Sequence, residues 1–199
     1  MDGDPAFDRG FYDSLTGTLD ELWARLVRGA ADRRSGFHTV QLASVGADGG
    51  ARVRTLVLRG VEREARRLRL HTDRRSAKAA EIAAEPLVEL LGYDARAKMQ
   101  IRVRGRAALH LSDDAKEAAW AATRGGSRTC YRGLAPGAAL DAPQEGDPSP
   151  AARAPDDPEA GRENFAALHV EAERLEWLYL AARGHRRALF AWDGAAWRG

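Results

Sequence analysis

The sequence predicts a mainly β protein, an antiparallel β-barrel with helices added between its strands. The first observation is that about seven or eight short runs rich in β-forming residues recur along the chain. The second is that these runs come in hairpin-like groups and not in regular strand–helix–strand alternation. That grouping favours an antiparallel barrel over a doubly wound sheet.

The first part of the chain predicts a helix followed by a β-hairpin. Over residues 14–31 leucines recur at helical spacing, and Thr18-Leu19-Asp20-Glu21 has the pattern of a capping box. Residues 37–45 and 51–58 are rich in β-forming side chains, and the turn 46–50 between them is rich in glycine. Two such runs around a glycine-rich turn predict a hairpin.

The middle of the chain predicts three strands and a helix. Short strands are expected at residues 68–72 and 87–92, separated by an alanine-rich helix at 75–84. A longer strand is expected at 99–110. Gly105 inside it indicates a bulge or a close approach of another backbone segment.

The last part of the chain predicts a helix, an irregular insertion and more strands. Ser112 is the expected N-cap of a helix that runs to about Ala122. Residues 124–160 lose all periodicity and hold six of the eight prolines. Residues 1–199 are therefore expected to form a single domain with an irregular insertion at about 124–160. The final strands are expected at 165–171, 175–182 and 188–192.

Composition and charge exclude several classes of protein. A formal net charge of +2 is too small to indicate nucleic-acid binding by itself. No stretch approaches the roughly 18 apolar residues that a membrane span needs, and the acidic N-terminus is not a secretory signal. The lone Cys130 excludes an internal disulfide and a cysteine-rich metal site, and no histidine pair has zinc-site spacing. We expect a cytoplasmic protein without a metal.

An arginine-rich strand at residues 52–60 is the first candidate binding segment. The alternation of a strand places Arg54 on the same face as Leu56 and Leu58. A guanidinium among apolar neighbours needs an anionic partner, because an unpaired buried charge is costly. That partner is either a carboxylate of the protein or the phosphate of a ligand, and the sequence leaves both open.

The second candidate segment, residues 71–78, lies where a strand ends and a helix begins. The start of a helix has free backbone N–H groups, which suit an anion. Without a ligand, the same residues describe a capped and solvated helix start. The side chains of the segment that could bind an anion are two hydroxyls and three cations: Thr72, Ser76, Arg74, Arg75 and Lys78.

Three segments in order along the chain resemble the pyridoxamine 5′-phosphate oxidase family of FMN-binding split barrels. They are 54–59 (RTLVLR), 72–78 (TDRRSAK) and 100–105 (QIRVRG). The second is similar to the oxidase-related branch, whose pattern is T-D-x-R-S-x-K. The resemblance is strong over roughly residues 35–110 and weak over the C-terminal strands.

The resemblance implies FMN as the cofactor and an antiparallel split β-barrel as the fold. It implies that Arg54 and Lys78 hold the FMN phosphate and that Ser76 and Arg75 assist them. In this family the cofactor lies at a dimer interface, so a homodimer is implied as well. The remaining implied contacts are Thr55 and Leu56 along the flavin, Arg59 near the ring, His71 and Thr72 beside the ribityl–phosphate region, Gln100 at the polar edge of the ring, and Arg124 and Arg128 as candidates from the second subunit.

The sequence also departs from the true oxidase. Ala77 stands where that enzyme has an arginine before the lysine, and Leu178 stands about where it has a tryptophan. Gly184-His185-Arg186-Arg187 does not reproduce the closing Arg-x-His signature. These departures argue against pyridoxamine phosphate as the substrate, and no residue stands out as catalytic.

The leading hypothesis is an FMN-dependent oxidoreductase of unknown substrate. In such a protein the flavin carries the hydride chemistry and the chain positions and tunes it. Two alternatives stay open. One is a flavin-binding protein or sensor without turnover, and the other is a split barrel that binds a different ligand, such as haem.

Overall fold

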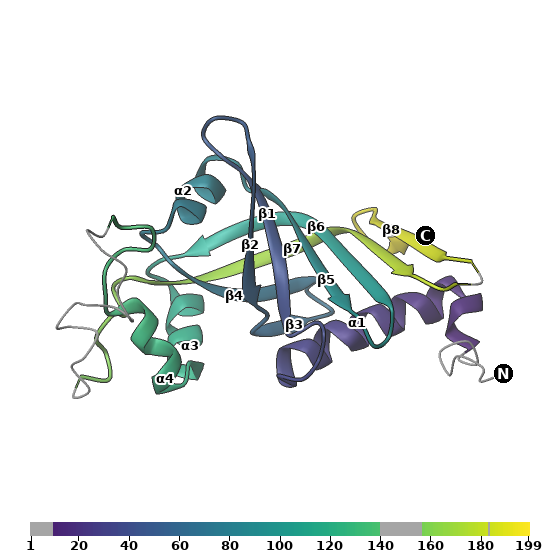
Figure 1. Cartoon of the computed structure of the whole chain (residues 1–199), viewed down its shortest axis with the longest axis horizontal. Helices are drawn as coiled ribbons and strands as arrows, with labels where there is room; N and C mark the ends of the chain where they lie inside the picture. Colours follow the sequence, from purple (N-terminus) through teal and green to yellow (C-terminus); the bar gives the residue numbers. More distant parts are fainter. Residues whose placement is uncertain (1–9, 140–156, 183) are drawn as a thin grey trace.

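Nine antiparallel strands form one sheet in the part of the chain that the structure describes, which comprises residues 10–139, 157–182 and 184–199. Figure 1 shows this computed structural model. The strands follow the order β2-β1-β5-β6-β7-β4-β3, and β8 joins β7 to β9. Their bounds are β1 Thr39–Val45, β2 Ala51–Val57, β3 Gly60–Glu62, β4 Arg67–Asp73, β5 Leu87–Asp94, β6 Met99–His110, β7 Phe165–Tyr179, β8 Arg186–Trp192 and β9 Trp197–Arg198.

The sheet closes into a barrel where the end of β2 meets β4. The N–H of Leu58, directly after β2, still donates to the carbonyl oxygen of His38 beside β1 over 2.9 Å, whereas the N–H of the next residue, Arg59, donates to the carbonyl oxygen of Arg69 in β4 over 2.8 Å. The two strands are in contact although several others lie between them in the strand order. The antiparallel, mainly β barrel predicted from the sequence is therefore confirmed.

Helices lie beside the barrel, with α2, α3 and α4 towards one end and α1 along one side (Figure 1). The longest, α1, contacts β3 and β8, α2 contacts β1 and β6, and α3 contacts β7. No helix in the described ranges is long and apolar enough to cross a bilayer. The helical segments are η1 Gly10–Asp13, α1 Leu15–Ala31, α2 Ala77–Ala84, α3 Asp114–Ala122, α4 Gly125–Arg128 and η2 Thr129–Tyr131.

The apolar stripe expected on the first helix does face the core, since Leu22, Trp23 and Leu26 are buried there. The expected capping box at Thr18 is wrong. The helix begins a turn earlier, where the side chain of Ser14 accepts a hydrogen bond from the N–H of Gly17 over 3.1 Å. Thr18 is instead buried and donates its hydroxyl to the carbonyl oxygen of Phe11.

The cap expected at Ser112 is also wrong by one position. Asp113 is the N-cap of α3, and its carboxylate accepts from the N–H of Lys116 over 3.0 Å. Both residue types cap well, so the sequence alone does not separate them. The helix expected at 75–84 begins at Ala77, because the preceding residues form the turn out of β4.

A single strand, β7, replaces the two strands expected at 165–171 and 175–182. Its buried residues change phase along its length: Leu168, Val170 and Ala172 are even-numbered, whereas Leu175 and Trp177 are odd-numbered. The change occurs at a β-bulge, where the register against β6 shifts between Arg104 and Gly105. The bulge explains why the alternation in the sequence breaks and why the strand nevertheless continues.

Part of the segment expected to be irregular has regular structure. Within its described residues it contains α4 and η2, and Tyr131 packs against a small cluster that includes Trp120 and Phe165. That cluster attaches α3 and the following segment to β7. The remainder of the expected insertion, residues 140–156, lies outside the described residues.

Replacing Gly105 with Ala should destabilise the protein. The added Cβ would lie 2.0 Å from the carbonyl oxygen of Glu171, a backbone atom that cannot rotate away. We expect the free energy of unfolding to fall by about 2–4 kcal/mol, measured by urea denaturation. Gly10→Ala is the control, because nothing lies within 4 Å of its added Cβ. Equal stabilities of the two variants would show that the bulge can relax.

Candidate functional site

The turn from β4 into α2 gathers the hydroxyls and the lysine of the second candidate segment. Thr72 and Ser76 are both buried, and their hydroxyl oxygens lie 3.3 Å apart. Ser76 donates to the carbonyl oxygen of Asp73 over 2.7 Å, and Lys78 Nζ donates to Thr72 Oγ1 over 3.3 Å. Burial, and then the positive charge of Arg54, lower the pKa of Lys78. The cluster therefore places two cations close together beside a helix start, as an anion site requires.

Arg54 has a carboxylate partner in this structure. Its Nη2 lies 2.5 Å from Oε2 of Glu81, and its Nη1 donates to Ser44 Oγ. Burial alone would raise the pKa of Glu81, but hydrogen bonds from Ser44 and Arg54 outweigh that effect and hold the pKa below its ordinary value. Of the two partners that the sequence leaves open for Arg54, the structure shows the carboxylate.

Arg75 is occupied by other groups. Its guanidinium pairs with Asp73, with Nη2 2.7 Å from Oδ2, and its Nη1 donates to the carbonyl oxygen of Gly133 over 3.0 Å. These contacts attach the segment after α4 to the turn between β4 and α2. The side chain thus links two parts of the site, and its assistance to a phosphate stays a prediction.

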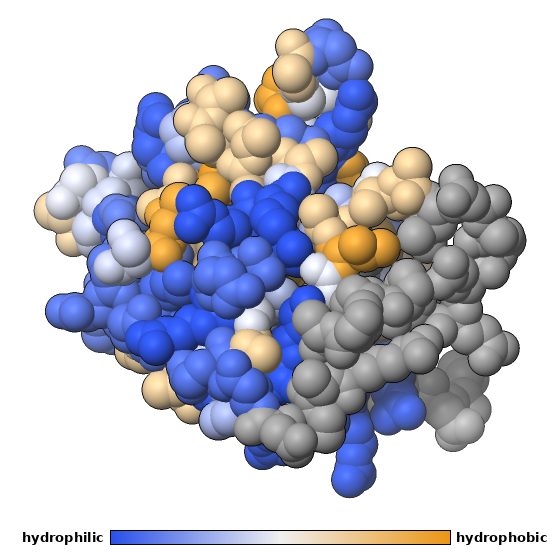
Figure 2. Space-filling view, turned by 90° about the vertical axis from the view of Figure 1, so that its left-hand side faces the viewer, coloured by the Kyte–Doolittle hydropathy of each residue, from blue (hydrophilic) through white to orange (hydrophobic). Residues whose placement is uncertain are grey.

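A second cationic group surrounds a pocket of about 240 Å³. None of its lining residues is an aspartate or a glutamate. Figure 2 shows the molecule from the end at which α2, α3 and α4 lie, and the described surface there is largely hydrophilic. The charged and imidazole side chains that line the pocket are Arg33, Arg59, Arg69, Arg124, His38 and His71.

Two buried nitrogen atoms of these lining residues have no hydrogen-bond partner in the described part of the chain. They are Nε of Arg69 and Nε2 of His71. Unpaired buried polar atoms are rare in proteins and call for an explanation. A ligand in the pocket would supply one, since an anion can accept from an arginine.

The hydrogen bonds of His71 indicate which ring nitrogen carries its proton. Thr123 donates its only hydroxyl proton to the carbonyl oxygen of Ala119 over 2.7 Å. Its Oγ1 can therefore only accept from Nδ1 of His71, which lies 3.4 Å away. Burial first, and then Arg59 and Arg69, lower the pKa of His71 to about 3. His71 is thus neutral, with Nε2 left as an acceptor among cations.

Gln100 and Thr55 lie on the other side of the sheet from Arg54. Directly paired residues of neighbouring strands share a face, so Arg54 lies on the side of the buried Leu42, opposite to Thr55 and its partner Gln41. Gln100 lines an outer hollow of about 510 Å³ together with Gln41 and Val53. One chain therefore does not bring Gln100 to the Arg54 cluster.

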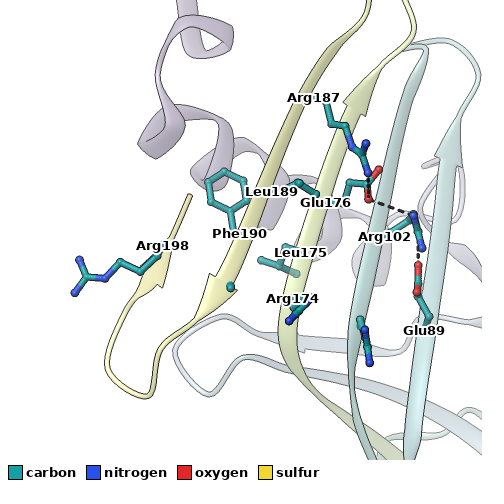
Figure 3. Close-up of a pocket in the computed structure, with 11 residues that line it drawn as sticks. Glu89, Arg102, Arg174, Leu175, Glu176, Arg187, Leu189, Phe190 and Arg198 are labelled. Atoms are coloured by element: carbon teal, nitrogen blue, oxygen red, sulfur yellow. Dashed lines mark hydrogen bonds and ion pairs between the residues drawn. The ribbon is translucent and has the colours of Figure 1, made fainter.

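A row of paired charges continues along this outer face (Figure 3). Arg102 bonds to Glu89 and lies 3.2 Å from Glu176, which in turn lies 3.0 Å from Arg187. They line a hollow of about 430 Å³. The strand predicted at 99–110 has the alternation that could have identified this outward set, but the individual pairings require the sheet register.

Within the same outer hollow, two arginines face each other without a carboxylate. Arg104 is directly opposite Arg174 in the β6–β7 ladder, and neither forms an ion pair with a described residue. Like charges at directly opposed positions destabilise a sheet, although water screens exposed ones. The outer face thus carries a local excess of positive charge.

The two arginines expected to reach a ligand from a second subunit have different environments. Arg124 lines the pocket of its own chain, as Arg59 does. Arg128 donates to the carbonyl oxygens of Trp120 and Thr123 and lies over the Trp120 ring at 4.4 Å. Arg128 therefore holds the segment after α3 in place, and its role at a ligand stays a prediction.

The expected absence of the closing Arg-x-His signature from this chain is wrong. Arg183-Gly184-His185 has that order, one residue before the segment compared above. Residue 183 lies outside the described residues, so the structure does not place the pair. One of the arguments against pyridoxamine phosphate as the substrate is thereby removed.

Lowering the pH should destabilise the fold, because His71 is buried in its neutral form. Its pKa in the fold is about 3, against an ordinary value of 6.5, so the unfolded chain takes up the proton first. The contribution of His71 is therefore constant above about pH 6.5 and is lost as the pH falls towards 3. His71→Asn should make the decline in unfolding free energy shallower, by up to about 1.4 kcal/mol per pH unit.

Urea denaturation between about pH 7 and 4 measures this slope. His185→Asn is the matched control, because His185 is exposed. Part of the decline should remain in His71→Asn, since burial also lowers the pKa of His169, to about 4. Identical slopes in His71→Asn and wild type would contradict the assignment.

Comparisons with known proteins identify the family of this chain. Residues 20–111 match the family described as "Pyridoxamine 5′-phosphate oxidase, FMN-binding domain". The pyridoxine/pyridoxamine 5′-phosphate oxidase 2 of Arabidopsis thaliana is 30% identical over 175 residues, which cover 82% of this chain and 86% of the relative. The corresponding oxidase of Cupriavidus pinatubonensis is 30% identical over 128 residues, which cover 63% of this chain and 52% of that protein.

Solved structures give the same result. A pyridoxamine 5′-phosphate oxidase-related, FMN-binding protein of Nostoc punctiforme superposes with a TM-score of 0.74 at 28% identity, covering 92% of this chain and 93% of that one. PhzG of Burkholderia lata, solved with tetrahydrophenazine-1-carboxylic acid, has a TM-score of 0.66 at 19% identity, covering 91% of this chain and 88% of that one. At this identity the likeness supports the fold alone. On the strength of its sequence match and its fold, this chain belongs to the pyridoxamine 5′-phosphate oxidase family of FMN-binding split barrels.

Proposed function

We propose that the protein is an FMN-dependent oxidoreductase that acts on a small anionic substrate. The observation that carries the proposal is the pocket lined by Arg33, Arg59, Arg69 and Arg124 without a carboxylate. Four guanidinium groups around one cavity, two buried nitrogens without a partner and a neutral imidazole suit a ligand with both a negative charge and a hydrogen-bond donor.

The residues around the start of α2 fit the phosphate end of FMN. Arg54 uses one N–H of each terminal nitrogen for Ser44 and Glu81, and a guanidinium has five N–H donors. Three donors therefore remain for a phosphate. Lys78 and the buried hydroxyls of Thr72 and Ser76 would complete the set. When bound, the flavin supplies hydride and electron transfer.

The remaining residues would bind and orient the substrate. Arg59 lies at the end of β2 and lines the anion pocket, so its charge would act on both the flavin ring and the substrate. Arg124, which lines the same pocket, would hold the anionic group together with Arg59. Neutral His71 would accept a hydrogen bond through Nε2. Catalysis would rest mainly on this positioning, because no side chain in the pocket stands out as a general acid.

We also infer that two copies complete the site. Arg54 and Gln100 lie on opposite faces of one sheet, so a single flavin cannot easily meet both in one chain. A partner whose outer face packs beside the Arg54 cluster would bring its own Gln100 to that site. On that face Val53 is 65% exposed and Leu189 is 55% exposed, so apolar side chains are available for a partner to cover.

Removal of the two cations should abolish flavin retention. We expect wild type to copurify with FMN, identified by its visible absorption band and by mass. Arg54→Ala combined with Lys78→Ala should weaken FMN binding by roughly 100-fold or more, because two charge-assisted contacts are lost. The control is Arg63→Ala with Arg106→Ala, two exposed arginines outside the site.

Stoichiometric flavin in the double variant would contradict the phosphate assignment. A haem spectrum in wild type would favour the alternative ligand. Bleaching of the flavin band by pyridoxamine 5′-phosphate or by NAD(P)H, followed by recovery in air, would distinguish an enzyme from a passive flavin binder.

Subunit mixing tests the shared site. Gln100→Ala dimers and Arg54→Ala/Lys78→Ala dimers should each bind FMN weakly. After subunit exchange, a mixed dimer has one site with both defects and one site with neither, so tight binding returns to a fraction of sites. Titration of the mixture with FMN measures that fraction, and light scattering measures the mass. A monomer, or exchange without recovery, would refute the shared site.

A further inference from the structure

The β1–β2 hairpin and helix α2 meet at Glu81. Ser44 comes from β1, Arg54 from β2 and Glu81 from the middle of α2. Oε2 of Glu81 accepts from Ser44 Oγ over 2.6 Å and from Arg54 Nη2 over 2.5 Å. Ser44 in turn accepts from Arg54 Nη1. The three side chains form a closed ring of hydrogen bonds around one carboxylate oxygen.

The ring is largely shielded from water. Ser44 is buried, and the side chains of Glu81 and Arg54 are 10% and 20% exposed. A shielded ion pair adds little net stability, because the loss of hydration offsets much of the attraction. Apolar side chains of similar volume would hold β1, β2 and α2 together about as well. The ring therefore calls for a reason other than stability.

Its geometry fixes the direction of one guanidinium. Arginine is long and loses much side-chain freedom when it is held in a single orientation. Here both terminal nitrogens of Arg54 have a fixed acceptor, so the plane of the guanidinium cannot turn. Three of its five N–H donors remain available on the other edges. Preorganised donors bind an anion more tightly than donors that must first be ordered.

The fixed guanidinium lies next to the other cation of the cluster. Glu81 and Lys78 are three residues apart on α2 and thus share one face of the helix. Lys78 reaches back to Thr72 at the end of β4. Two cations with one carboxylate leave a net positive charge at this place. Ala77 provides no charge. The affinity for a phosphate should therefore depend more on the orientation of Arg54 than it would if a second arginine stood at position 77.

We propose that Glu81, supported by Ser44, is a positioning residue of the phosphate subsite: it holds Arg54 in the orientation that binds the flavin phosphate. This role rests on the proposed FMN function. Glu81 would not touch the cofactor. It would act through Arg54 alone. Its oxygen atom would serve as a hydrogen-bond acceptor, and its negative charge would be less important.

Comparison of FMN with riboflavin, which lacks the phosphate, tests the role. Glu81→Ala should weaken FMN binding by about tenfold or more, since a loose arginine must be ordered at each binding event. Riboflavin affinity should change by less than about threefold. Glu81→Gln keeps an acceptor oxygen and should retain FMN affinity within about threefold of wild type.

Ser44→Ala and Glu64→Ala complete the set. Ser44→Ala removes the second acceptor of Arg54 and should also weaken FMN more than riboflavin. Glu64→Ala removes an exposed glutamate elsewhere and should change neither affinity. If Glu81→Ala does not fold, Ser44→Ala and Glu81→Gln still decide: a selective loss of FMN in the first and none in the second supports the role.

Other results overturn the proposal. Equal losses of FMN and riboflavin would make the ring purely structural. Tighter FMN binding in Glu81→Ala or Glu81→Gln would mean that the carboxylate competes with the phosphate. Wild type that takes up neither flavin would refute the proposed function and this role together. Normal flavin uptake by wild type with unselective losses in the variants would refute the role alone.

Discussion

The pairing of β6 with β7 is the constraint on which the rest of the structure depends. This ladder runs the full length of β6 and determines which side chains face the core and which face outward. On its inner face lie core residues such as Ile101 and Trp177, and on its outer face lie Gln100, Arg102 and Arg174 (Figure 3). Every other strand takes its register directly or indirectly from these two.

The distribution of arginines separates structural from ligand-directed cations. Arg66, Arg75 and Arg128 donate to the backbone carbonyl oxygens of Ala172, Gly133 and Pro158, and so connect segments that are distant in sequence. The arginines around the small pocket, by contrast, have no carboxylate among their fellow lining residues. In a chain so rich in arginine, a group of cations alone does not indicate a binding site. A group of cations without nearby carboxylates indicates an anionic ligand more strongly.

The sequence was sufficient for the type and order of most elements and for the two cationic segments, because both depend on local pattern. It could not show that Glu81 is the partner of Arg54, since helix spacing does not reveal which strand a helix covers. Arg33 and Arg69 were also missed at the pocket, because one lies in the turn after α1 and the other in β4, and only the fold brings them together. The short strands β3 and β9 have too few residues to produce a pattern.

At the bulge in β7, one residue can be replaced by most others but cannot be deleted without changing the sheet. Before the bulge β7 pairs with β4, and after it with β8, so the sheet branches where the extra residue is accommodated. That residue, Glu173, has a partly exposed side chain whose ion-pair partner is the exposed Arg106. Most other residues could therefore replace it. Its deletion would instead reverse the facing of one half of the strand relative to the other. A survey of substitutions at this position would find that most variants fold, whereas a survey of insertions and deletions would find that most variants do not.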